Sequence, residues 1–138
     1  MDLTSARDHL GLAQKQWDSA ATDSWEPAEP ESCVSSVFYA YENVVVALAE
    51  AFGISWKKTH PNKVDIAAQL AKDGKVSKDI SQLLVRLNGL RKDISYGEPG
   101  SSLLNEDLET LVSDLESMID EADAIISKLE EEAAEGVQ

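Results

Sequence analysis

The chain of 138 residues has few of the residue types that cross-link proteins or hold metals: one cysteine and two histidines. A single cysteine, Cys33, excludes an internal disulfide and any multi-cysteine zinc site. The histidines, His9 and His60, lie far apart, and no Glu-x-x-His motif accompanies them, so we expect no bound metal. A phosphate-binding glycine loop is also missing, and we expect no cofactor.

Long apolar runs are missing as well. No stretch of the sequence approaches the roughly 18 apolar residues of a membrane span. The opening residues, MDLTSARDHL, lack the basic start and apolar block of a secretion signal. Because there is no membrane segment and only one thiol, the simplest expectation is a cytoplasmic protein.

Basic residues are scarce and unevenly placed. The formal net charge is −14, yet residues 57–92 hold nine basic and three acidic residues. Residues 101–138 carry twelve acids and one base, Lys128. The whole protein should repel nucleic acid at long range, whereas the basic segment should not. Two interpretations stay open: the basic segment neutralises the acidic helices beside it, or it meets an anion.

Apolar residues recur at helical spacing along nearly the whole chain, and prolines and glycines mark the loops. The pattern predicts helices over 3–20, 32–52, 61–72, from a cap at Ser77 to about 96, and from Ser102 or Asn105 to about 131. The last of these carries a heptad pattern that ends at Leu129. We therefore expect an all-α fold, an antiparallel bundle of four long helices and one short one. Residues 1–131 should form one domain, and residues 132–138 a disordered acidic tail.

Four smaller expectations concern single side chains. Trp25, in the loop TDSWEPAEPES, should be anchored on the core, because a free indole would expose a large apolar surface. His9 should face solvent, opposite the apolar stripe of the first helix. Thr59 can cap the short helix, and Gly53 can end the second one.

Arg91 raises the question that carries most of the functional reasoning. It falls on the apolar stripe of its helix, together with Leu84 and Leu87, and a guanidinium cannot lose its proton when it is buried. Three explanations compete. The side chain reaches solvent at the helix end, or pairs with Glu42 or Glu50, or lines a cleft where it meets a phosphate.

The stretch LNGLRKDISYGEP, residues 87–99, resembles the signature of the HEPN family, the "higher eukaryotes and prokaryotes nucleotide-binding" domains. The segment FYAYENVVVALAEAFG is similar to an alanine- and aromatic-rich helix of that family. The resemblance covers about residues 30–130. It implies a bundle of four to five helices, with a motif arginine near the end of the penultimate long helix and a histidine four to six residues later.

The resemblance also implies a homodimer in whose shared cleft two Arg–His pairs form a metal-independent RNase site. Many members of the family are paired with a nucleotidyltransferase as toxin and antitoxin, and others are not catalytic. Arg91 matches the motif arginine, Asp93 matches a polar position inside the motif, and Tyr96 stands where the histidine should be. A phenol with a pKa near ~10 is a poor acid or base at neutral pH, so any RNase activity should be weak or lost.

We therefore expect a homodimer that binds RNA or nucleotide around Arg91 and Tyr96. The supporting candidates are Arg86, Asn88, Lys92, Asp93 and His60. His60 is the one histidine in the basic segment, although a polar residue at a helix start explains it more simply. The alternative is a non-enzymatic acidic interaction module, an antitoxin-like or regulatory partner from the same operon. An acidic mimic of DNA is a weaker third possibility.

Overall fold

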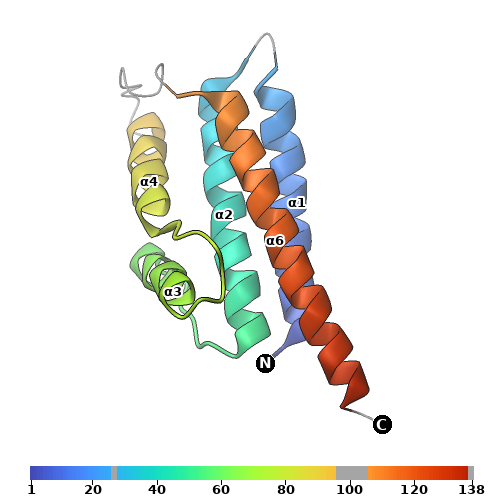
Figure 1. Cartoon of the computed structure of the whole chain (residues 1–138). Coiled ribbons are helices and arrows are strands. Elements are labelled where there is room, and N and C mark those ends of the chain that lie inside the picture. Colours follow the sequence, from blue (N-terminus) through green and yellow to red (C-terminus); the bar gives the residue numbers. More distant parts are fainter. Residues whose placement is uncertain (26–27, 96–105, 137–138) are drawn as a thin grey trace.

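The computed structural model describes residues 1–25, 28–95 and 106–136, and the regular structure in these residues is entirely helical. Five helices follow one another in these segments (Figure 1): α1 Leu3–Asp23, α2 Pro30–Phe52, α3 His60–Lys72, α4 Ser81–Ser95 and α6 Leu108–Glu135. No strand occurs in the described part of the chain. The expected all-α class is therefore confirmed.

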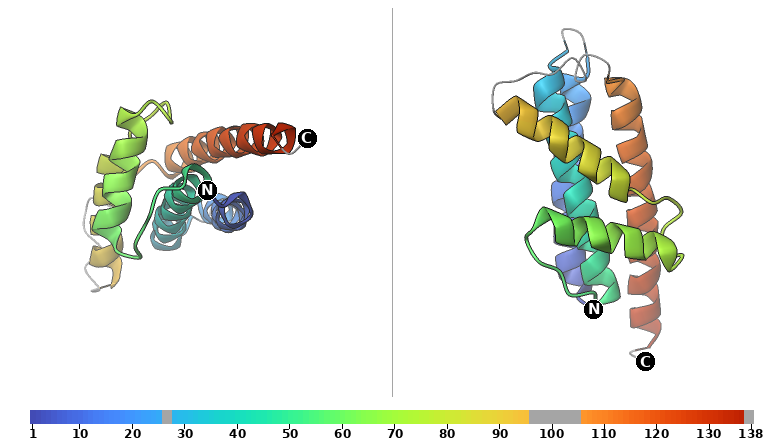
Figure 2. Two further views of the ribbon diagram at one scale, coloured as in Figure 1. Left: turned by 90° about the horizontal axis from the view of Figure 1, so that it is seen from below. Right: turned by 90° about the vertical axis from the view of Figure 1, so that its left-hand side faces the viewer.

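Three long helices form the body of the molecule. α1, α2 and α6 lie lengthwise beside one another, α1 antiparallel to α2 and α6 in the same direction as α2 (Figure 1). α3 and α4 pack on each other and on α2, and both are inclined to the long helices (Figure 2). The structure thus has three long and two shorter helices, where the sequence predicted four long and one short, because α4 has only 15 residues.

α2 is the central helix, in contact with α1, α3, α4 and α6. Fourteen of its 23 residues are buried, which explains why its apolar residues spread around most of its circumference. By length and composition alone α2 would also be able to cross a membrane, and 72% of its most apolar window is buried inside the protein. A buried core helix meets the same criteria, so this composition does not by itself indicate a membrane span. α2 ends at Phe52, and Gly53 follows as the expected stop, with φ of 70°.

α1 approaches α2 through small residues. Its buried positions are Ala6, Leu10, Ala13 and Ala20, and three alanines on one face let two helix backbones come close. The helix begins after Asp2, whose carboxylate accepts a hydrogen bond from the Ser5 N–H at 2.9 Å. α1 is thereby held against both α2 and α6.

α6 begins later and ends later than the heptad pattern predicted. Asp107 caps it by accepting from the Thr110 N–H at 3.1 Å, so the first helical residue is Leu108. The helix continues to Glu135, four residues into the segment expected to be disordered, because alanine and glutamate favour helix. The heptad positions 111, 115, 118 and 122 are buried as expected, and Val112, Ile119 and Ile126 join them. A straight helix of 3.6 residues per turn drifts away from a 3.5 repeat, which widens its buried face across both α1 and α2.

The start of α4 corrects the expected cap at Ser77. The N–H of Ser77 donates to Glu121 of α6 at 2.8 Å, and its hydroxyl donates to the same carboxylate. The helix begins four residues later at Ser81, whose N–H donates to Asp79 at 2.9 Å. Ser77 therefore binds Glu121 on α6 and does not cap α4.

Thr59 occupies the N-cap position of α3, but its side chain makes no capping hydrogen bond. The nearby connector is instead fixed by Asn62, which accepts from the Lys57 N–H at 2.6 Å. The expectation that Thr59 caps this helix is therefore wrong in its detail, although the helix does start there.

Two aromatic expectations are also wrong. The Trp25 side chain is 69% exposed, because α1 runs on to Asp23 and places the indole just beyond its end. His9 is half-buried and packs its ring against Trp56, with the ring centroids 5.8 Å apart. The connector after α2 brings Trp56 to His9, and the Trp56 indole N–H donates to Glu50 at 2.8 Å. At His9, the face of α1 that looked free is thus met by Trp56.

Candidate functional site

Arg91 lies in the last turns of α4, on the side that faces α2. The same side buries Leu84, Leu87 and Leu90 against the core, while the Arg91 side chain is only half-buried. α4 therefore buries these three leucines and brings the guanidinium to the edge of the interface. Tyr96, the second residue of the expected site, lies outside the described residues.

The guanidinium of Arg91 rests on two aromatic rings of α2. Its central carbon is 5.1 Å from the ring centroid of Phe38 and 5.8 Å from that of Tyr39. Its Nη2 also donates to Oδ1 of Asn88, one turn earlier on α4, at 2.9 Å. A cation over the face of an aromatic ring is attracted by the negative charge of that face. The position of Arg91 on an apolar stripe thus has an electrostatic explanation in the rings it covers.

The two carboxylates considered as partners of Arg91 are engaged elsewhere. Glu50 accepts from Trp56, and Glu42 binds two side chains of α3. Oε2 of Glu42 is 3.0 Å from Nδ1 of His60, and Oε1 is 3.3 Å from Nζ of Lys63. Glu42 is only 8% exposed, so this ion pair is desolvated and ties α3 to α2.

His60 and Arg91 contact the same aromatic ring, that of Phe38. Its ring is tilted against Phe38 with the centroids 5.6 Å apart, while Arg91 covers the same ring. When Nδ1–H of His60 donates to Glu42, Nε2 is left as a hydrogen-bond acceptor. His60 therefore has a structural role, because it binds Glu42, the carboxylate that ties α3 to α2.

The structure brings together only some of the predicted site residues. Arg91 and His60 both contact the ring of Phe38, and the buried side chain of Asn88 accepts a hydrogen bond from Arg91. Lys92 and Asp93 are exposed on the following turn of α4. Arg86 points elsewhere and forms an ion pair with Glu106, just before α6.

Tyr39 is the site residue that the sequence reasoning missed. Its ring meets Phe38 edge to face at a centroid distance of 5.2 Å and is 43% exposed. The sequence did offer one signal for it. Tyr39 lies beside the apolar stripe of α2, where an aromatic residue adds no core contact and can serve binding instead. Together, Tyr39 and Arg91 form a half-exposed aromatic and cationic surface, which we call the Arg91 surface.

The Arg91 surface has the chemistry of a binding site. An exposed aromatic ring stacks on planar groups, and a guanidinium binds carboxylate or phosphate. Within residues 1–25, 28–95 and 106–136, no group of three or more histidine, cysteine or acidic side chains is placed to hold a metal.

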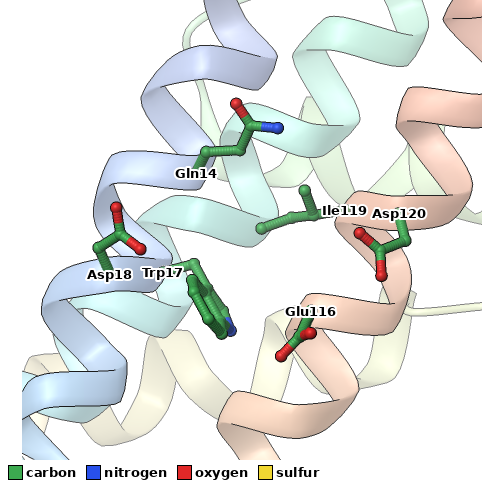
Figure 3. Close-up of a pocket in the computed structure, with 6 residues that line it drawn as sticks. All are labelled: Gln14, Trp17, Asp18, Glu116, Ile119 and Asp120. Carbon is green, nitrogen blue, oxygen red and sulfur yellow. The ribbon is translucent and has the colours of Figure 1, made fainter.

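A concave region lies between α1 and α6, on the acidic side of the molecule (Figure 3). It encloses about 240 Å³ and is lined by Gln14, Trp17, Asp18, Glu116, Ile119 and Asp120. The indole N–H of Trp17 donates to the carbonyl of Val112 at 3.0 Å, which fixes the ring. We call this region the acidic groove, because three carboxylates surround its aromatic wall.

Comparisons with known proteins found no likeness for this chain: no family model matches it, and neither do any of the curated proteins or solved structures searched. The geometry of the Arg91 surface and of the acidic groove therefore carries the functional argument.

Proposed function

We propose that this chain is a HEPN-like helical bundle that works as a homodimer and binds RNA or nucleotide in a cleft around Arg91 and Tyr96. The observation that supports the proposal best is the position of the Arg91 guanidinium, over Phe38 and Tyr39 at a half-exposed edge. At this edge the half-buried guanidinium of Arg91 lies beside an exposed ring, that of Tyr39, where a ligand can reach both.

The chemistry of arginine favours an anionic ligand here. Arginine stays charged at every physiological pH, and its planar fork matches the oxygens of a phosphate. Asn88 fixes one of its nitrogen atoms, so the group is oriented before a ligand arrives. Pre-orientation lowers the entropy that binding must overcome.

Local charge supports the same ligand in spite of the net charge of −14. Exposed Lys92 follows Arg91 directly, and the basic segment forms α3 and α4, on one side of α2 (Figure 2). Part of that segment is neutralised internally, since Lys63 pairs with Glu42 and Arg86 with Glu106. Neutralisation by acidic neighbours thus accounts for Lys63 and Arg86, and the proposal assigns the anion to Arg91 and Lys92.

RNase activity in this proposal is weak or lost. Tyr96 replaces the motif histidine, and a phenol is a poor acid–base group near neutral pH. We also propose that the protein is cytoplasmic and binds its ligand without a cofactor.

Fluorescence anisotropy with a labelled oligoribonucleotide and with a labelled nucleotide tests the proposal. Arg91→Ala should weaken binding at least about tenfold, since a charged hydrogen bond is lost, while the circular dichroism spectrum stays helical. Lys72→Ala is the matched control, because it removes one exposed cation from α3 away from the Arg91 surface. Equal losses in both variants, or no binding by the wild type, would contradict the proposal.

The acidic groove favours a second candidate function, a non-enzymatic interaction module that binds a basic partner such as the other product of an operon pair. Asp18, Glu116 and Asp120 surround Trp17, and a lysine or arginine of a partner would meet carboxylates and an aromatic ring together.

A triple substitution, Asp18→Asn with Glu116→Gln and Asp120→Asn, should abolish binding of a lysine-rich peptide in this alternative. A control triple at the exposed residues Glu131, Glu132 and Glu135 of α6 changes the net charge equally. If both triples weaken binding to the same extent, the attraction is one of overall charge and the groove has no special part in it.

A further inference from the structure

We infer that Tyr39 is a base-stacking residue, so that the ligand of the Arg91 surface is an unpaired nucleobase carrying a phosphate, in single-stranded RNA or a free nucleotide. The inference rests on the proposed function and narrows its ligand class. Its basis is the arrangement of three side chains, Phe38, Tyr39 and Arg91.

Tyr39 differs from its neighbours on α2. Phe38 and Tyr41 are 2% and 1% exposed, whereas the Tyr39 ring is 43% exposed. Exposed apolar residues are common when they are isolated, but this ring is held on two sides. Phe38 meets it at an interplanar angle of 66°, and the Arg91 guanidinium lies 5.8 Å from its centroid. A ring that is fixed before binding loses little conformational entropy when another ring stacks on it.

The chemistry of the pair selects a nucleotide over other anions. Tyr39 offers a flat apolar face, which a bare phosphate or a carboxylate does not use. Arg91 beside it offers a cation, which a neutral aromatic compound does not use. A nucleotide presents a planar base and a charged phosphate at adjacent positions, so one ligand satisfies both groups.

Duplex nucleic acid fits the same surface poorly. Its bases are stacked on each other, and their faces are therefore hidden from a protein ring. Binding to a duplex relies instead on many cations along the backbone. Here Lys63 and Arg86 are paired with carboxylates, and acidic residues dominate the rest of the chain. Few phosphates can be neutralised, so the salt dependence of binding should be shallow, equivalent to about one or two phosphates.

The experiment compares three labelled ligands on the full chain by anisotropy: a single-stranded oligoribonucleotide, the same sequence in a blunt duplex, and a mononucleotide. We expect the single strand to bind about tenfold or more tightly than the duplex. Tyr39→Ala should weaken single-strand binding by about ten- to a hundredfold, while Tyr39→Phe, which keeps the ring, should bind like the wild type. Leu12→Ala, at a residue of similar exposure on α1, is the control and should change nothing.

The possible results separate this inference from the proposed function. Loss of binding in both Arg91→Ala and Tyr39→Ala supports the stacking role. Loss in Arg91→Ala alone, or equal affinity for duplex and single strand, overturns the stacking role and leaves the proposed function standing. Failure of all three ligands to bind the wild type overturns both. Thermal unfolding of Tyr39→Ala, whose ring is outside the core, shows whether the fold is kept.

Discussion

At the scale of single residues, Arg7 connects the two ends of the sequence. Its guanidinium, on α1, donates to Glu130 at 2.8 Å and to the Ser127 hydroxyl at 2.7 Å, and it pairs with Asp123. The hydrogen bond from Arg7 holds the pKa of Glu130 below its ordinary value of 4.5. Three side chains of α6 thus share one cation of α1.

We expect Arg7→Ala to lower the Tm by about 2–4 °C, because partly exposed ion pairs are individually weak. Lys15→Ala, an exposed cation on the same helix, should leave the Tm unchanged. Calorimetry of the two variants beside the wild type measures the difference.

The effect of Arg7→Ala should depend on pH in one direction. A carboxyl group with a lowered pKa in the folded state adds stability above its ordinary pKa and loses it as the pH falls through the lowered value. The gap in Tm between the wild type and Arg7→Ala should therefore be constant at neutral pH and should shrink below about pH 4.5. A gap that stays constant into strong acid would mean that Glu130 is not part of the contact.

Gly53 and Gly74 have the same backbone conformation, but only Gly53 has a close neighbour. Gly53 and Gly74 both have φ of 70°, but a Cβ at Gly53 would lie 3.1 Å from the Met1 nitrogen, and one at Gly74 would meet nothing within 4 Å. Alanine at either position should cost about 1–2 kcal/mol for the left-handed backbone. Gly53→Ala should cost more, because the chain start must also move. Urea unfolding of both variants tests the order, and equal losses would show that the start of the chain yields freely.

At the scale of elements, the attachment of α3 to α2 depends on Glu42. Glu42→Gln removes the charge that faces Lys63 and His60, and leaves a largely buried ammonium without its carboxylate. We expect a loss of about 3 kcal/mol in the free energy of unfolding. Hydrogen exchange should become faster in α3 before it does in α1 or α6.

Glu31→Gln provides the control for this prediction. Glu31 is exposed in the first turn of the same helix, so the substitution changes the same charge without touching the α2–α3 contact. If the two variants lose equal stability, Glu42 has no special part in holding α3.

Elements were predictable where their signal is local. The apolar spacing of α1 and α2, and the glycine after α2, placed those helices within a few residues. The start of α4 was not predictable, because Ser77 binds Glu121, a residue 44 positions away. The heptad pattern predicted the helix of α6 but not the cap at Asp107. A distant contact decided the start of α4, whereas the cap at Asp107 is a local hydrogen bond with Thr110 that the heptad pattern does not encode.

The candidate site was predictable in the same uneven way. The wheel of α4 placed Arg91 on the buried side, and the structure agrees. Its aromatic partners were not predictable, since Phe38 and Tyr39 come from another helix. Glu42 was considered as a partner of Arg91, but it binds His60 and Lys63 of α3. The fit of the sequence to the HEPN signature stays a prediction.

At the scale of the whole molecule, the proposed homodimer predicts a solution mass twice the 15.0 kDa of one chain. If the interface includes the outer face of α4, Val85→Asp should produce monomers, because Val85 is 50% exposed there. Light scattering of the wild type and the variant measures the change.

Leu12→Asp is the control for the dimer, since Leu12 is 47% exposed on α1, a helix on the other side of α2. A wild-type protein that is monomeric at every concentration would end the dimer part of the proposal. If Leu12→Asp rather than Val85→Asp dissociates the dimer, the interface lies on the side of α1 and the acidic groove, not on α4.

The contact between Arg7 and Glu130 joins residues 123 positions apart, which has a consequence for the order of events during synthesis. α1 and α2 are close in sequence and can pair while the ribosome is still translating. The sides of both helices that receive α6 stay open until α6, Leu108–Glu135, has been made and has emerged. A nascent chain is therefore exposed to chaperones and proteases on this apolar surface until α6 packs against it.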